Sequence, residues 1–368
     1  MKCNAIGVIS SNYTNEDFGR LTEKRSVASL PFGGRYRLID FPISNMANSG
    51  MTTVGIVTPN YYRSILDHVG VGKPWGLARN TGGLFLLPGT VYGTRETGSR
   101  FLLKDMIRNE AYFERAKEDY VVFMDSSKVM NLEIEPFIEA HEKSGRDVTL
   151  LYVKTENHKG AHYLTIDEET GAVTKITDEN DYNENRFLDA FIMSREFLMN
   201  LCKWYGARSN MDLMDIIGFN MDKFSVGAYE FKGYVGIISD VADFMRVNMD
   251  LLNIDVRMEL FGNPERMICT KIQDAPPALY ETGAKVKNSL VASGCIIEGT
   301  VENSIIFRST HIKPGAVVRN SIVMLHTVIE KGAYIDNLIC DKYVTVSEGV
   351  HVSGGRERPI IAGKGVLL

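Results

Sequence analysis

The sequence predicts a two-part fold: an α/β domain built on a mostly parallel β-sheet, followed by a parallel β-helix. Short apolar runs alternate with helix-like stretches through roughly the first 250 residues, which is typical of α/β domains. The character of the sequence changes near Asp274–Pro277, and a short aliphatic motif then repeats. We expect the α/β domain at 1–255, a linker at 256–282 and the β-helix at 283–368.

The expected elements of the first part follow from apolar periodicity. Compact apolar or β-branched runs predict strands, and apolar residues at helical spacing predict helices. The expected strands are Ala5–Ile9, Thr52–Thr58, Tyr120–Met124 and Val148–Val153, and the expected helices are Tyr61–Val69, Arg195–Tyr205 and Val241–Leu252. Ligands bind such sheets at the carboxyl ends of the strands.

The repeat in the last part has four copies, which begin at Val286, Val301, Val318 and Ile335 and are 15, 17 and 17 residues apart. Aliphatic residues also recur every six positions, which predicts a hexapeptide β-helix with about 18 residues per coil. The spacing departs from 18, and this indicates irregular corners. A β-sandwich of short strands is the alternative, but a sandwich does not impose a six-residue period.

Composition excludes several classes of protein. The chain has 41 basic and 46 acidic residues, so no basic excess indicates nucleic acid or an anionic membrane as a partner. No apolar run approaches the roughly 20 residues of a membrane-spanning helix, and the N-terminus lacks the apolar length of a secretory signal. The five cysteines are scattered without a CxxC pair, as expected of reduced thiols in a cytoplasmic protein.

The run Leu30–Asn45 reads Leu-Pro-Phe-Gly-Gly-Arg-Tyr-Arg-Leu-Ile-Asp-Phe-Pro-Ile-Ser-Asn. It closely resembles the signature of the glucose-1-phosphate adenylyltransferase (ADP-glucose pyrophosphorylase) family. Segments at Lys73–Trp75, Tyr92–Thr94 and Asn288–Gly299 also match, so the resemblance extends along essentially the whole chain. It implies a Rossmann-like, GT-A-like nucleotidyltransferase domain followed by a left-handed parallel β-helix.

Nucleotidyl transfer to a sugar phosphate needs a glycine-rich loop for the triphosphate, a divalent cation, and cationic side chains for the sugar phosphate. The loop of the family is glycine-rich, whereas Ile9–Gly19 has a single glycine. We interpret it as a surface loop, with an altered phosphate loop as the alternative. Family lysines fall on Val27, Glu179 and Met214 here, although Asp215 beside Met214 is kept.

Asp125 matches the first metal-binding aspartate of the family and follows a predicted strand. The position of the second metal-binding aspartate is held by Ile237, which cannot ligate a metal, and Asp240 lies three residues further on. We therefore assign no metal site, with Asp125 as the one candidate ligand, and expect Mg²⁺ only if residual catalysis exists. The alternative for Asp125 is the N-cap of a following helix.

Four cationic residues, Lys24, Arg25, Arg35 and Arg37, lie in or just before the signature run. They are candidates for binding a substrate, a phosphorylated effector or a partner subunit. The structural alternative is that the arginines form ion pairs with Asp40 or other nearby acids.

These departures resemble those of a subunit that keeps the family's fold and has lost its catalytic groups. The expected function is a regulatory, non-catalytic or weakly catalytic subunit in ADP-glucose and glycogen synthesis. Its expected partner is a catalytic homologous subunit, in a heterotetramer, and a homo-oligomer is also possible. An active adenylyltransferase with a rebuilt site is the alternative. A β-helix acyltransferase that uses His311, His326 or His351 is the least favoured reading.

Overall fold

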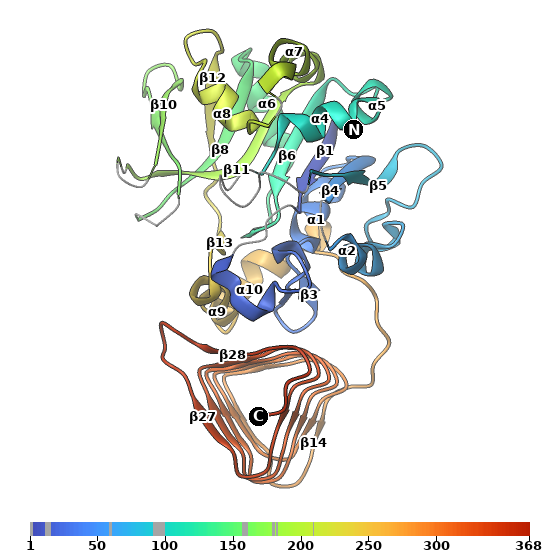
Figure 1. Cartoon of the computed structure of the whole chain (residues 1–368), viewed down its shortest axis with the longest axis vertical. Coiled ribbons are helices and arrows are strands. Elements are labelled where there is room, and N and C mark those ends of the chain that lie inside the picture. The colour runs from blue at the N-terminus through green and yellow to red at the C-terminus, as the bar shows by residue number, and fades with distance from the viewer. Residues whose placement is uncertain are drawn as a thin grey trace. The chain divides into compact units, whose positions relative to one another are not determined.

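The computed structural model describes residues 3–11, 16–58, 61–90, 100–156, 161–178, 181, 183–208 and 210–368 (Figure 1). Contacts divide the chain into two compact units, each assembled from separate stretches. The first unit comprises Met1–Thr14, Ile39–Val235 and Pro264–Cys269, and the second comprises Asn15–Leu38, Gly236–Asn263 and Thr270–Leu368. The linear boundaries 1–255, 256–282 and 283–368 follow a different division of the chain and stay a prediction.

The first unit is built on a nine-stranded sheet in which β6, β1, β4 and β5 are parallel neighbours. On the other side of β6, β11 pairs antiparallel with both β6 and β8, so the sheet is mixed. The strands are β1 Ala5–Ser10, β4 Thr53–Thr58, β5 Gly83–Pro88, β6 Tyr120–Asp125, β8 Val148–Lys154, β9 Tyr163–Ile166, β10 Val173–Thr177, β11 Asn185–Ser194 and β12 Val226–Glu230.

Helices flank this sheet, and α4, α5 and α7 pack against one another (Figure 1). The helices of the unit are α1 Asp40–Asn48, α2 Tyr62–Val69, α4 Leu103–Arg108, α5 Glu110–Glu114, α6 Ile134–Ser144, α7 Arg195–Tyr205 and α8 Leu213–Gly218, with short 3-10 turns at Lys73–Trp75, Gly206–Arg208 and Pro264–Arg266. Every strand and helix predicted for the first 250 residues is confirmed, with small shifts at the ends, although the helix predicted at Val241–Leu252 belongs to the second unit. No helix in the described part of the chain is long and apolar enough to cross a bilayer.

Aromatic packing fixes β6 against β11. The rings of Phe123 and Phe191 stack with their centroids 4.6 Å apart, and Phe101 meets both rings edge-on. All three side chains are buried, so their packing holds β6 and β11 together near Asp125 and Asp189.

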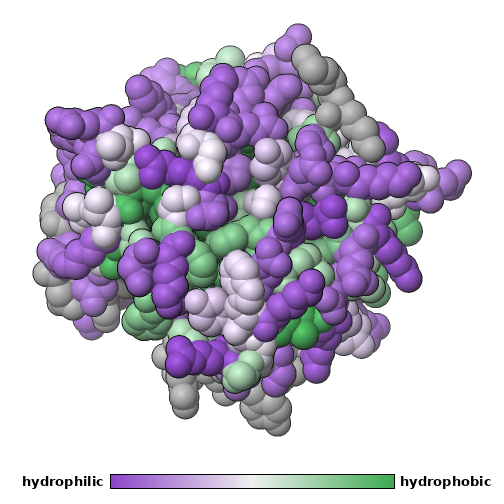
Figure 2. All heavy atoms as spheres, turned by 90° about the horizontal axis from the view of Figure 1, so that it is seen from above, coloured by the Kyte–Doolittle hydropathy of each residue, from purple (hydrophilic) through white to green (hydrophobic). Residues whose placement is uncertain are grey.

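Seen from above, the molecule presents mostly polar side chains, with hydrophobic ones gathered near the centre of the face (Figure 2).

The second unit contains a left-handed parallel β-helix, as predicted. Its strands form three five-stranded parallel sheets. One sheet comprises β14 Leu279–Tyr280, β17 Ile296–Ile297, β20 His311–Ile312, β23 Val328–Ile329 and β26 Thr345–Val346; the second comprises β15 Lys285–Lys287, β18 Thr300–Glu302, β21 Val317–Arg319, β24 Tyr334–Asp336 and β27 His351–Ser353; the third comprises β16 Leu290–Val291, β19 Ile305–Ile306, β22 Ile322–Val323, β25 Leu338–Cys340 and β28 Ile360–Ala362.

The asparagine of each repeat turns one corner of its coil; a serine follows it in the first three copies and Leu338 follows it in the fourth. Asn288, Asn303, Asn320 and Asn337 all have positive φ, between 42° and 49°, a conformation that asparagine tolerates better than most residues. Asparagine side chains also connect neighbouring coils by hydrogen bonds: Asn288 Nδ2 donates to Asn303 Oδ1 at 2.8 Å. The strand pairing matches the spacing of the repeat: Val286 pairs with Val301, Val301 with Val318 and Val318 with Ile335, so these three coils are shorter than the predicted 18 residues.

The signature run belongs to this second unit up to Leu38. Its first half forms a hairpin of β2 Pro31–Phe32 and β3 Tyr36–Arg37, and the turn uses Gly33 and Gly34 at φ 56° and 84°. Gly33 N donates to Asn248 Oδ1 at 3.0 Å, and the Tyr36 ring stacks on Phe261 at 4.9 Å. The remaining elements are β13 Gly236–Ile237, α9 Val241–Asp250, α10 Ile254–Phe261 and 3-10 turns at Glu16–Leu21 and Val27–Ser29.

Candidate functional site

Asp125 ends strand β6, where the parallel pairing with β1 sets it beside Ser10. Its side chain is buried, and Oδ2 accepts hydrogen bonds from Ser127 N and from Lys128 Nζ, both at 3.0 Å. The Ser127 hydroxyl also donates to Oδ2. No helix begins here, because the chain continues into the short strand β7 Lys128–Val129 and α6 starts only at Ile134. The N-cap interpretation of Asp125 is therefore wrong.

Lys128 joins Asp125 to a second buried aspartate. Its ammonium nitrogen contacts Asp125 Oδ2 and also forms a short ion pair with Asp189 Oδ2. Asp189 lies in β11, whose antiparallel pairing with β6 sets Ala190 opposite Met124. A register shift of β11 against β8 between Phe187 and Phe191 accompanies the positive φ of 53° at Asp189.

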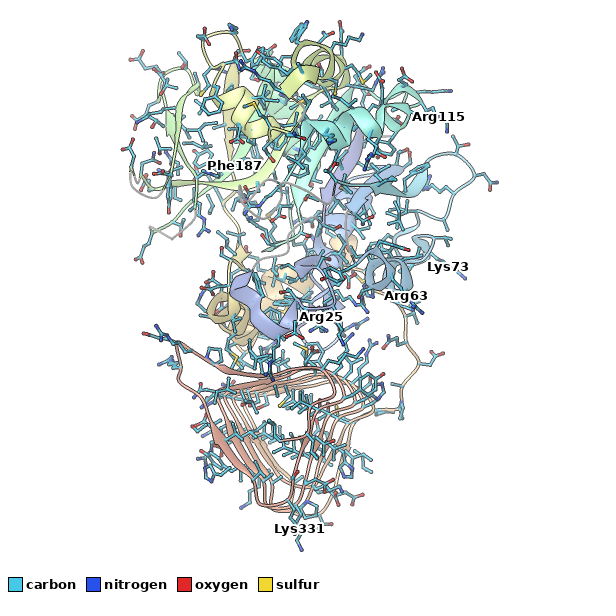
Figure 3. All side chains as sticks on the ribbon, in the orientation of Figure 1. Arg25, Arg63, Lys73, Arg115, Phe187 and Lys331 are labelled. Carbon is cyan, nitrogen blue, oxygen red and sulfur yellow. The ribbon has the colours of Figure 1, made fainter. Side chains whose placement is uncertain are left out.

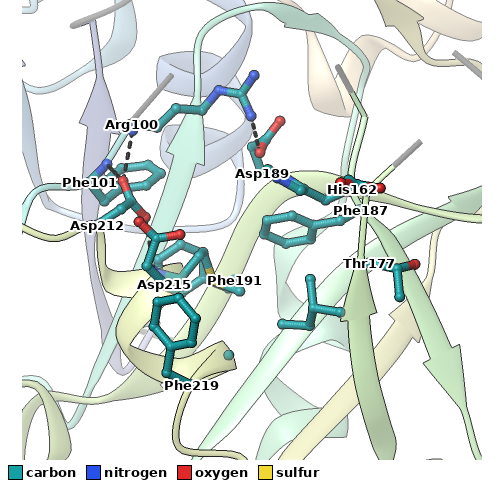
Figure 4. A pocket seen from close by; sticks show the side chains of 14 residues that line it. Arg100, Phe101, His162, Thr177, Phe187, Asp189, Phe191, Asp212, Asp215 and Phe219 are labelled. Atoms are coloured by element: carbon teal, nitrogen blue, oxygen red, sulfur yellow. Dashed lines mark hydrogen bonds and ion pairs between the residues drawn. The ribbon is translucent and has the colours of Figure 1, made fainter. Parts of the chain in front are cut away.

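Arg100 completes the cluster, which we call the Asp125 cluster and define as Arg100, Asp125, Lys128 and Asp189. Arg100 Nη1 forms an ion pair with Asp189 Oδ1 (Figure 4). Arg100 Nε lies 3.9 Å from Asp125 Oδ2. Burial alone would raise the pKa of both carboxyls, but Lys128 and Arg100 outweigh it, so both pKa values are lowered. The cluster thus holds two carboxylates and two cations in a buried, charge-balanced arrangement.

A cavity of about 320 Å³ adjoins the cluster. Its lining combines aromatic rings, four aspartates and two basic side chains: Arg100, Phe101, His162, Ile176, Thr177, Asp178, Phe187, Asp189, Phe191, Asp212, Met214, Asp215, Gly218 and Phe219. Among the described lining residues, only Arg100 and His162 can carry positive charge, and Arg100 is already paired with Asp189. The cavity is therefore poor in groups that could bind a phosphate.

Asp212 shapes one wall of the cavity through backbone hydrogen bonds. Its Oδ2 accepts from Arg100 N at 2.8 Å and Phe101 N at 2.7 Å, and Oδ1 accepts from Met214 N at 2.9 Å, which caps α8 (Figure 4). Burial raises the pKa of Asp212 to about 6 despite these hydrogen bonds. Its role is to connect the segment at Arg100 with the start of α8.

The structure brings some of the sequence-derived positions together. Met214 and Asp215 line the cavity, as does Asp178, which directly precedes the family lysine position held here by Glu179. Glu179 itself, residues 12–15 of the Ile9–Gly19 loop and the Tyr92–Thr94 segment lie outside the described residues. Lys128 and Asp189 were not identified as site residues from the sequence. Lys128 lies only three residues after Asp125, and this short spacing could have indicated an ion pair between them.

Ile237 belongs to the second unit, where it is buried in β13. Asp240 caps α9, since its carboxylate accepts from Asp243 N at 2.7 Å. Within the described part of the chain, no group of three or more His, Cys, Asp or Glu side chains could hold a metal ion. The Asp125 cluster does not fit a divalent cation either, because an ammonium group already bridges its carboxylates.

The second unit carries the predicted cationic residues, and they differ in environment. Arg25 is buried, where Nη2 pairs with Asp341 Oδ2 at 2.8 Å and Nε donates to Leu21 O at 2.9 Å. Lys24 and Arg35 are exposed, and the Arg35 guanidinium lies 5.2 Å from the centroid of the Tyr36 ring. The carboxylate of Asp40, the acid considered as a partner for the arginines, contacts His68 Nε2 at 2.5 Å.

Further cations of the β-helix gather around these residues. Burial, followed by the charges of Arg37, Arg25 and Lys364, lowers the pKa of Lys342 to about 7 although Asp341 opposes the shift. Burial and Arg35 likewise lower the pKa of Arg308. A cavity of about 520 Å³ is lined by residues that include Arg308, His326, Lys342 and Tyr343. Half-buried cations that also repel one another form a surface that an anion would stabilise.

Sequence comparisons agree with this architecture. Residues 19–179 match the nucleotidyl transferase family model, and residues 277–358 match the C-terminal hexapeptide model of GlmU-like proteins. The fold and these matches define the class: a nucleotidyltransferase domain joined to a hexapeptide β-helix.

Similar proteins narrow the class further. The chain is 36% identical over 316 residues to the glycogen biosynthesis protein GlgD of Geobacillus stearothermophilus, covering 85% of this chain and 82% of that protein. It is 31% identical over 312 residues to GlgD of Bacillus subtilis, covering 84% and 81%. The glucose-1-phosphate adenylyltransferase of Halalkalibacterium halodurans is 29% identical over 324 residues, covering 85% and 83%. The chain belongs to the glucose-1-phosphate adenylyltransferase family of glycogen biosynthesis, together with the GlgD proteins.

Proposed function

We propose that this chain is a regulatory subunit of glucose-1-phosphate adenylyltransferase, without catalytic activity of its own or with very little. It assembles with a catalytic homologous subunit, as a heterotetramer, and changes that subunit's rate or its response to metabolites. The observation that carries the proposal is the Asp125 cluster. The aspartate that matches the family's metal ligand is neutralised by Lys128, and the charge that a divalent cation would supply is already present.

The cavity beside the cluster supports the same conclusion. Binding a sugar phosphate requires cationic side chains, and four aspartates contribute to the described lining. Met214 and Asp178 stand in segments where the family has lysines. An anionic substrate entering this cavity meets like charge, which raises the cost of binding it.

Assembly with a homologue is supported by the first coil of the β-helix. In the described residues, β14, β15 and β16 are the outermost strands of their sheets and pair on one side only. Leu279, Tyr280 and Val286 on this coil are 50%, 52% and 38% exposed. Unpaired strand edges with exposed apolar side chains favour pairing with another chain. A catalytic homologue with the same β-helix offers a matching edge, because surfaces that pair homologues also pair paralogues.

Regulation is supported by the cations of the second unit. The site offered to a phosphorylated effector comprises Arg35, Arg37, Arg308 and Lys342. The effector's charge would favour the protonated form of Lys342, which burial and the neighbouring arginines disfavour. Lys24 is exposed and stays a candidate from the sequence alone. Arg25 is already paired with Asp341, so we assign it a structural role beside this site.

The deciding experiment measures the initial rate of a catalytic homologue from the same organism, with and without this chain, across a range of effector concentrations. We expect co-elution on a sizing column and a changed rate or effector response. An unchanged rate and response, together with separate elution, would contradict the proposal.

The alternative, an active adenylyltransferase with a rebuilt site, is tested with this chain alone. ATP and glucose 1-phosphate are supplied with Mg²⁺, and pyrophosphate release is measured. The regulatory proposal expects no turnover above that of an Asp125→Ala variant. Robust turnover that Asp125→Ala abolishes would favour the enzyme.

A further inference from the structure

The Asp125 cluster has the layout of a cation site in which the cation is a side chain. Two carboxylates from neighbouring strands, Asp125 of β6 and Asp189 of β11, converge on one nitrogen atom, Lys128 Nζ. The Ser127 hydroxyl lies beside them, 3.0 Å from the same nitrogen. Carboxylate and hydroxyl oxygens around one positive centre are the ligand set that hard divalent cations use, with water completing the shell.

One oxygen of this set has unused capacity. Asp125 Oδ1 is fully buried and has no hydrogen-bond partner in the described structure, whereas Oδ2 accepts from Ser127 and Lys128. A buried carboxylate oxygen without a partner is costly. A metal ion can engage both oxygens of a carboxylate, which an ammonium held on a lysine stem does not achieve here.

Asp189 adopts a left-handed backbone conformation, which places its carboxylate in the cluster. Its φ of 53° lies in the left-handed region, which most residues other than glycine, asparagine and aspartate avoid. Conformations of this kind persist where the surroundings hold them, and here the carboxylate is held by both Lys128 and Arg100. The arrangement is thus built around a buried positive charge.

We propose that Lys128 is a covalently attached replacement for a divalent cation, and that Asp125, Asp189 and Ser127 form a latent Mn²⁺ or Mg²⁺ site that opens when the lysine is shortened. The stem of Lys128 fills the space and its ammonium supplies the charge. Ligand binding in the adjoining cavity is therefore independent of metal in the natural chain. This inference does not depend on a regulatory role or on a partner subunit.

The test uses the full-length Lys128→Ala protein and Mn²⁺, followed by electron paramagnetic resonance and titration calorimetry. We expect saturable Mn²⁺ binding at least about tenfold tighter than in the natural chain, and a rise in melting temperature with Mn²⁺ concentration. Arg100 still pairs with Asp189 in this variant, so we expect only moderate affinity for Mn²⁺. Adding Asp189→Asn to Lys128→Ala removes one charged ligand and should abolish the binding.

Two controls separate metal binding from loss of the ion pairs. Lys143→Ala breaks an exposed ion pair with Glu139 in the same unit and should leave Mn²⁺ binding unchanged. Lys128→Met removes the charge but keeps the stem, so it should be destabilised without gaining Mn²⁺ affinity. If Lys128→Ala folds only in the presence of Mn²⁺, the dependence itself supports the proposal.

Two results would overturn the inference. The first is a Lys128→Ala protein that gains neither Mn²⁺ binding nor thermal stabilisation by Mn²⁺, whether it is folded or fails to refold with the ion present. The second is equally tight Mn²⁺ binding by the natural chain that Asp125→Asn abolishes, because the lysine would then not occupy the cation's place.

Discussion

Replacing Arg25 by methionine should destabilise the second unit strongly, although the residue is a candidate for effector binding. The Arg25 and Asp341 side chains are 9% and 3% exposed, and their nitrogen and oxygen atoms are 2.8 Å apart. Removing one partner of a buried ion pair costs about 3–5 kcal/mol, because the remaining charge is left uncompensated. Asp341 keeps a hydrogen bond from Lys342 N at 2.7 Å, so we expect the lower end, about 3 kcal/mol.

Equilibrium unfolding in urea, followed by far-UV circular dichroism, measures the loss. Hydrogen exchange locates it, since amides around β25 and β26 should exchange faster in Arg25→Met. Lys24→Met is the matched control, because Lys24 is the exposed neighbour and its loss should change stability by less than about 0.5 kcal/mol. Asp341→Leu combined with Arg25→Met removes both charges and should recover part of the loss.

The reasoning fails if Arg25→Met unfolds at the same urea concentration as the natural chain. It also fails if the single variant keeps full stability but loses the effector response, since Arg25 would then bind the effector directly. Lys331→Met serves as a distant reference, because Lys331 lies at a corner of the β-helix well away from Arg25 (Figure 3).

Three further predictions concern the second unit. Because burial and Arg37 lower the pKa of Lys342 from 10.5 to about 7, the unfolded chain binds more protons between these values, so stability rises with pH there. Between these pH values, the urea midpoint should change less with pH in Lys342→Met than in the natural chain. The same pH dependence in both proteins would contradict the assignment. Asn320→Ala places alanine at φ 42° and should cost about 1–2 kcal/mol more in thermal unfolding than Asn320→Gly, because both variants lose the hydrogen bond to Asp336 Oδ1 but only alanine is strained; equal losses would argue against the corner. Val286→Lys on β15 should prevent co-elution with a catalytic homologue while the melting temperature stays constant; retained co-elution would exclude this edge as the interface.

The elements of the fold could be predicted because their signals are local. The run Tyr120–Met124 is apolar and β-rich, and it forms β6 with one residue added. The asparagines of the repeat recur because each of these corners needs a residue with positive φ, so the repeat is visible without knowledge of the contacts. The antiparallel insertion of β11 between β6 and β8 was not predictable in this way, since no local pattern states which strands pair.

The candidate site was predictable only in part. Asp125 could be identified by its place at the end of a strand, but its partner Asp189 lies far along the chain and reaches Lys128 through the pairing of β11 with β6. The buried role of Arg25 was equally hidden, because it depends on Asp341 in a coil of the β-helix. Long-range ion pairs of this kind depend on tertiary structure, and no periodic pattern in the sequence predicts them.

The two ends of the β-helix differ, and this limits how far copies could stack. At the last coil, Thr345 N and Ser347 N donate to Val366 O and Leu368 O, and Leu368 packs against the interior side chains. Residues 366–368 thus cover the outer edge of β26, whereas β14 at the other end of the same sheet pairs on one side only in the described residues. A contact between two first coils joins like edges and closes on itself, so it gives a finite assembly and not a fibre.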